Sequence, residues 1–134
     1  MMNQKILLKM LNYFGYRADL ASSGSEAIEA IQRQPYDVIL MDIQMPEMDG
    51  LTATQLIRED PRIAKQPWIV AVTAHAMAGV REEYLNQGIN DYLSKPIKKS
   101  LLIPVLKLAR QQKITSLNSL HLIKLNYKAV FSRS

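Results

Sequence analysis

Short apolar runs alternate along this chain with longer stretches whose hydrophobic residues recur at helical spacing. The short runs predict strands, and they lie at residues 17–21, 38–41, 68–72 and 91–93. The helical stretches carry their apolar residues at 6–14, 27–31, 51–57, 77–87 and 101–111. Strands that alternate with helices in this way form a parallel sheet with helices on both faces. The sequence therefore predicts an α/β fold.

Composition limits the class of protein. The chain has 134 residues, of which 48% are hydrophobic, and this size and content suit one domain with its own core. It has no Cys, so disulfides and thiolate metal sites are excluded. No apolar run approaches the ~20 residues that a membrane span needs. The first residues lack the features of a signal peptide, so we expect a cytoplasmic protein.

Three chemically active side chains follow three of the predicted strands. Asp42, Thr73 and Lys95 each come at or just after a strand end. Alone, each has a structural explanation as a turn former, a strand terminus or a solvated charge. In open α/β sheets, however, ligands bind at the carboxyl ends of the strands. A carboxylate, a hydroxyl and an ammonium at one rim would suit an acyl phosphate on Asp42.

The segments around these residues resemble the receiver domains of two-component response regulators. The resemblance is carried by Ile39–Gly50, Val72–Ala74 and Asp91–Pro96, in family order and at family separations. The resemblance covers roughly residues 3–113. Within the family, the chain is most similar to receivers of hybrid sensor histidine kinases. The resemblance implies a flavodoxin-like, doubly wound parallel sheet.

The resemblance also implies roles for individual residues. Asp42 would accept a phosphoryl group from a histidine kinase or a histidine-phosphotransfer domain, and Lys95 would pair with that group. Thr73 and Tyr92 would form the conformational switch. Mg²⁺ would be held by Asp42 and the main-chain carbonyl of Gln44. Such a module is not a stand-alone enzyme, although it catalyses its own phosphorylation; it would be one piece of a hybrid kinase or a response regulator.

The chain departs from this family pattern at its beginning. Receivers start with an apolar strand that ends in an acidic pair, whereas this sequence starts at the expected first helix and has no acid before Asp19. We therefore expect a receiver fold truncated at the N-terminus, with the acidic pair missing. Mg²⁺ is usually held by one or two carboxylates, waters and phosphate oxygens, so the metal site should be weak. Phosphorylation by small phosphodonors should be slow.

The end of the chain is basic, because residues 96–134 hold eight Lys or Arg and no acid. These basic residues are dispersed, and nothing after residue 113 has the two helices of a helix-turn-helix, so nucleic acid binding is not expected. We place the receiver at residues 1–113 and a basic tail at 114–134. Apolar residues alternate with polar ones from Ile123 to Phe131, a strand pattern. A central position would bury Lys124 and Lys128, so we expect an edge strand, an exchange between two chains, or disorder.

Two alternative functions remain open from the sequence. One is a degenerate receiver that binds partners without being phosphorylated. The other is an enzyme of the haloacid-dehalogenase type, which also uses a strand-end Asp but needs a second Asp two residues later, where this chain has Gln44. His75 has no second ligand at metal-binding spacing, so we assign it a surface role.

Overall fold

The computed structural model describes residues 4–44, 48–74, 80–116 and 128–132, and these contain one five-stranded sheet. The strands are β1 (Arg17–Ala21), β2 (Val38–Asp42), β3 (Trp68–Thr73), β4 (Asp91–Ser94) and β5 (Lys128–Ser132). Their spatial order is β1-β5-β2-β3-β4, and all neighbouring pairs are parallel. The predicted α/β class and parallel sheet are therefore confirmed.

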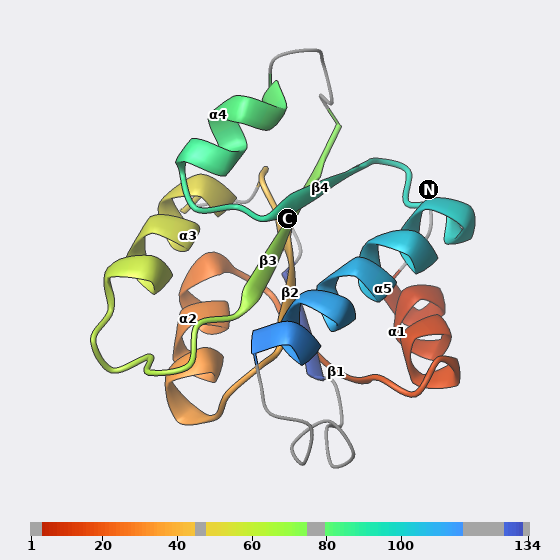
Figure 1. Cartoon of the computed structure of the whole chain (residues 1–134), viewed down its shortest axis with the longest axis horizontal. Coiled ribbons are helices and arrows are strands. Elements are labelled where there is room, and N and C mark those ends of the chain that lie inside the picture. Colours follow the sequence, from red (N-terminus) through yellow and green to blue (C-terminus); the bar gives the residue numbers. More distant parts are fainter. Residues whose placement is uncertain (1–3, 45–47, 75–79, 117–127, 133–134) are drawn as a thin grey trace.

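Helices cover both faces of the sheet (Figure 1). They are α1 (Gln4–Tyr13), α2 (Gly24–Arg33), α3 (Gly50–Glu59), α4 (Val80–Asn86) and α5 (Lys99–Ser116). Helices α2, α3 and α4 lie on one side, and α1 and α5 lie on the other (Figure 1). Gly15 and Gly88 follow α1 and α4 with φ of 89° and 96°, a conformation that ends helices and favours glycine. This is the doubly wound arrangement predicted from the sequence.

Successive residues of the central strands face opposite layers. Ile39 and Met41 of β2 pack with α2, α3 and α4, whereas Val38 and Leu40 pack with α1 and α5. All four side chains are fully buried. This burial on both faces explains why residues 38–41 read as a continuous apolar run without alternation. The same run delivers Asp42 to the rim of the sheet.

The structure corrects the prediction for the end of the chain. Residues 128–132 form a strand as expected, but β5 lies between β1 and β2 and not at an edge. It pairs with β1 along Arg17–Ala21, and its residues 129–131 face Val38–Leu40 of β2. One strand in this position satisfies the exposed backbone groups of two neighbours, which outweighs the charge argument. Residues 123–127 of the predicted strand lie outside the described residues.

Two helices differ in extent from the sequence prediction. Helix α4 begins at Val80, while the first part of the predicted helix, residues 77–79, lies outside the described residues. Helix α5 begins at Lys99 and continues to Ser116, past the predicted end at residue 111 and past the proposed domain boundary at 113. Its early start places Pro104 inside the helix and not in its first turn.

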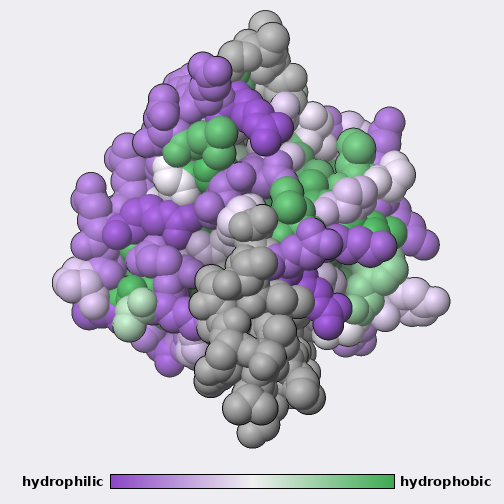
Figure 2. Space-filling model, in the orientation of Figure 1, coloured by the Kyte–Doolittle hydropathy of each residue, from purple (hydrophilic) through white to green (hydrophobic). Residues whose placement is uncertain are grey.

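The surface drawn in Figure 2 is hydrophilic over most of its area, with separate apolar patches among the polar side chains. Large exposed apolar side chains lie on four of the helices. They are Ile6, Tyr13, Leu56, Leu85, Leu101 and Leu108. Within the part of the chain that the structure describes, no helix is long and apolar enough to span a membrane.

Candidate functional site

Asp42 ends the buried strand β2 at the carboxyl rim of the sheet. Only 6% of the residue is exposed. The backbone beyond it stays close to β3, because Ile43 donates its N–H to the Val72 carbonyl at 3.0 Å. The carboxylate is thus held at a fixed place on the rim by the regular pairing of β2 with β3, which includes Asp42 itself.

Lys95 reaches this carboxylate directly. Its Nζ lies 2.8 Å from Asp42 Oδ2, and the lysine side chain is 20% exposed. The loop that carries Lys95 is anchored by its own N–H, which donates to the Thr73 carbonyl at 2.8 Å, and it continues through a cis Lys95-Pro96 peptide. The other carboxylate oxygen, Asp42 Oδ1, accepts the Gln44 N–H at 3.0 Å. Both oxygens of Asp42 therefore have hydrogen-bond donors, one of them a cation.

Gly50 shapes the loop that follows Asp42. A Cβ at this position would lie 2.6 Å from the Asp42 carbonyl oxygen and 2.9 Å from Ile43 Cα, closer than side chains approach backbone. The Gly50 N–H donates to the Ile43 carbonyl at 3.0 Å, which folds the start of α3 back against the strand end. In the sequence, Gly50 is only the last residue of the segment 39–50 that resembles the family. Its close approach to Asp42 depends on the path of α3 and has no local sequence signal.

The predicted switch residues Thr73 and Tyr92 are joined by a third side chain. Thr73 ends β3 and is 1% exposed, whereas Tyr92 on β4 is partly buried. Tyr84 of α4 lies between them: its hydroxyl is 3.4 Å from Thr73 Oγ1, and its ring meets the Tyr92 ring edge to face at 6.5 Å between centroids. Sequence reasoning missed Tyr84, because its position in a helical apolar stripe predicts only core packing.

The oxygen atoms that the described residues place around Asp42 do not make a magnesium site. Within the described ranges, no group of three or more His, Cys, Asp or Glu side chains is placed to hold a metal ion. Both Asp42 oxygens are engaged, as described above, and the Asp49 carboxylate caps α3 by accepting the Thr52 N–H at 2.8 Å. Strand β5, which lies beside β2, adds no carboxylate side chain, because residues 96–134 contain no Asp or Glu. Mg²⁺ favours carboxylate oxygens, and among the described residues they are too few at this site.

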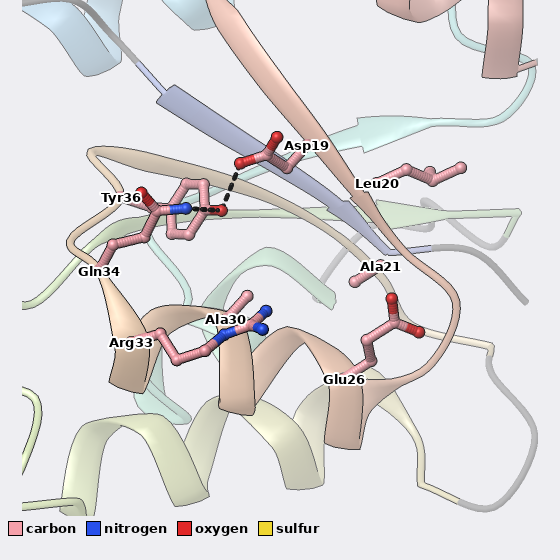
Figure 3. A pocket seen from close by; sticks show the side chains of 8 residues that line it. All are labelled: Asp19, Leu20, Ala21, Glu26, Ala30, Arg33, Gln34 and Tyr36. Carbon is pink, nitrogen blue, oxygen red and sulfur yellow. Dashed lines mark hydrogen bonds between the residues drawn. The ribbon is translucent and has the colours of Figure 1, made fainter.

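A separate hollow of about 590 Å³ lies between β1 and α2 (Figure 3). Tyr36 donates a hydrogen bond to Asp19 there and accepts one from Gln34 at 2.8 Å. Burial and the bond to Asp19 raise the pKa of Tyr36 to about 12. The hollow contains none of the predicted site residues.

His75 and Glu47 lie outside the described residues.

Comparison with known proteins identifies the family. Residues 1–107 match the model of the response regulator receiver domain. The chain is 45% identical over 100 residues to the signal transduction histidine-protein kinase BarA of Escherichia coli. This match covers 75% of the chain but only 11% of BarA. It is also 46% identical over 99 residues to hybrid signal transduction histidine kinase G of Dictyostelium discoideum, covering 72% of the chain and 3% of that protein.

Solved structures agree with this assignment. The receiver domain of sensor histidine kinase PA1611 from Pseudomonas aeruginosa, which has a magnesium ion coordinated in its active site cleft, is 42% identical. The match covers 79% of this chain and 86% of that one, with a TM-score of 0.68. A two-component response regulator from Clostridium difficile is 29% identical with a TM-score of 0.72, covering 82% and 88% of the two chains. The chain belongs to the response regulator receiver domain family of two-component signalling proteins.

Proposed function

We propose that this receiver accepts a phosphoryl group on Asp42 from a phosphohistidine of a histidine kinase or a histidine-phosphotransfer domain. The observation that supports this most is the buried Asp42 carboxylate with Lys95 Nζ 2.8 Å from it. In open α/β sheets ligands bind at the carboxyl ends of the strands, where Asp42 lies. Lys95, on the loop that follows β4, is then available to neutralise the transferred group.

The transfer is a single displacement at phosphorus. An oxygen of Asp42 attacks the phosphohistidine, a P–O bond forms, and the P–N bond to the imidazole breaks with its electron pair left on nitrogen. Lys95 exchanges its bond to Asp42 for a phosphoryl oxygen, and the Thr73 hydroxyl donates to another. Tyr92 responds to the movement of Thr73 and changes the partner-binding face. The protein acts as a phosphoacceptor in the cytoplasm, as a part of a larger signalling chain.

The contacts of Asp42 also support one alternative, a receiver that binds partners without phosphorylation. The Asp42 carboxylate is already paired with Lys95 and with the Gln44 N–H, and the described residues do not form a magnesium site. Both readings place the function on the same face of the molecule. Exchange of β5 between two copies also stays a prediction, because a swapped dimer would reproduce the same parallel ladders.

Labelling with acetyl phosphate tests the proposal. We expect slow phosphorylation at one site that intact-mass spectrometry detects, and that changes little when Mg²⁺ is replaced by EDTA. Asp42→Asn should abolish it, whereas Glu29→Gln on the exposed side of α2 should leave it unchanged. Rapid labelling that depends strongly on Mg²⁺ would show that the metal site is complete. Complete absence of labelling, from acetyl phosphate and from a phosphorylated histidine-phosphotransfer domain, would support the binding-only alternative.

A further inference from the structure

Tyr84 contacts both predicted switch residues, Thr73 and Tyr92. It lies on α4, which covers the face of the sheet opposite α1 and α5, and only 7% of it is exposed. Its hydroxyl donates to Thr73 Oγ1 at 3.4 Å, and its ring packs edge to face on Tyr92 with an interplanar angle of 71°. Tyr84 therefore contacts Thr73 through its hydroxyl and Tyr92 through its ring.

We infer that Tyr84 is a positioning residue of the switch, whose hydroxyl holds Thr73 in the resting orientation and so opposes phosphorylation. This inference rests on the proposed function, in which Thr73 moves toward a phosphoryl group on Asp42. When the Thr73 hydroxyl turns toward that group, it breaks its hydrogen bond with Tyr84. The Tyr84 hydroxyl and the phosphoryl group therefore compete for Thr73 Oγ1. The hydrogen bond between Tyr84 and Thr73 stabilises the unphosphorylated conformation by its own net free energy.

The length of the contact decides how strong this restraint is. Hydrogen bonds between two hydroxyls are usually 2.5–3.0 Å long, so a 3.4 Å contact is near the weak limit. Burial works in the opposite direction, because water does not replace a hydrogen bond that is lost between two buried hydroxyls. A weak buried bond suits a switch, since it biases the equilibrium by about two- to fivefold without locking it.

Tyr84→Phe tests the inference because it removes the hydroxyl and keeps the ring. The first measurement does not depend on phosphorylation: NMR couplings of Thr73 report its χ1 rotamer populations. We expect one dominant rotamer in the wild type and a shift of the rotamer populations in Tyr84→Phe, while the ring signals of Tyr92 stay in place. Tyr13→Phe, at a tyrosine that is 83% exposed, is the matched control and should change neither. An unchanged Thr73 rotamer in Tyr84→Phe overturns the inference.

The second measurement is the labelled fraction at a fixed acetyl phosphate concentration. Tyr84→Phe should raise the ratio of labelled to unlabelled protein about two- to fivefold. In a Thr73→Val background the same substitution should add nothing, because the hydroxyl that Tyr84 contacts is already gone. A ratio equal to wild type, or an equal rise in both backgrounds, contradicts the restraint. If the wild type takes no label at all, the proposed function fails, and the rotamer measurement still decides whether Tyr84 positions Thr73.

Discussion

The ion pair between Lys95 and Asp42 should make a measurable contribution to the stability of the unphosphorylated protein. The perturbation is Lys95→Met, which keeps the apolar stem and removes the ammonium. It leaves the Asp42 carboxylate, whose side chain is 8% exposed, with the Gln44 N–H as its remaining partner among the contacts described above. A buried carboxylate that loses its cation is destabilised, because water cannot replace the lost partner.

The magnitude follows from burial and distance. Hydrogen bonds to charged groups contribute about 1.5–3 kcal/mol net, and breaking a fully buried ion pair costs about 3–5 kcal/mol. At 2.8 Å the geometry of this pair is good, but the Lys95 side chain is 20% exposed, so solvent screens it in part. We therefore expect Lys95→Met to lower the free energy of unfolding by about 2 kcal/mol.

A double-mutant cycle with Asp42→Asn isolates the pair from other effects of the two substitutions. Urea unfolding of the wild type, both single variants and the double variant gives the coupling energy, expected at about 1.5–2 kcal/mol. For an m-value of about 2 kcal/mol per molar, Lys95→Met lowers the urea concentration at the midpoint of unfolding by about 1 M. A coupling energy under about 0.5 kcal/mol, the range of exposed pairs, would refute the reasoning.

Two further predictions concern the loop after β2 and the hollow beside β1. Gly50→Ala should lower the unfolding free energy by about 1–3 kcal/mol and slow labelling, because its Cβ would meet the backbone of Asp42. Urea unfolding measures the change in stability. The control is Gly24→Ala, whose Cβ would meet the flexible side chain of Met48 and which should have a smaller effect. The pKa of Tyr36 is about 12 in the folded protein against an ordinary 10.0, so its contribution to stability is complete below about pH 10 and is lost as the pH rises toward 12. The wild type should therefore lose stability more steeply than Tyr36→Phe over that interval in urea unfolding, and parallel pH profiles would contradict the assigned cause.

The sheet and the rim could be predicted because their signals are local. Strands β2 and β3 are short apolar runs that end in Asp42 and Thr73, and Lys95 directly follows β4. The rule that parallel strands present their carboxyl ends at one edge then brings Asp42, Thr73 and Lys95 together. The direct contact of Lys95 with Asp42 is the geometric result of that rule.

The place of β5 could not be predicted in the same way. Strand pairing between residues far apart in sequence leaves no local pattern, so the prediction depended on the cost of burying lysines. Lys124 lies outside the described residues, and Lys128 is the first residue of the strand, opposite Arg17. Ala129, Val130 and Phe131 are the residues that face β2. The charge argument treated the whole alternating segment as buried, whereas the strand that enters the sheet is mainly apolar.

The position of β5 has a consequence for the order in which this protein folds. Among the described elements β5 comes last in the sequence, yet it joins β1 to β2 in the middle of the sheet. During synthesis both neighbours leave the ribosome well before the strand that connects them. The contacts of β5 with β1 close a loop that spans most of the chain, and such distant pairings slow folding. Until β5 arrives, β1 and β2 each keep an additional unpaired edge, and chaperones or an extended segment of another chain can bind there during this period.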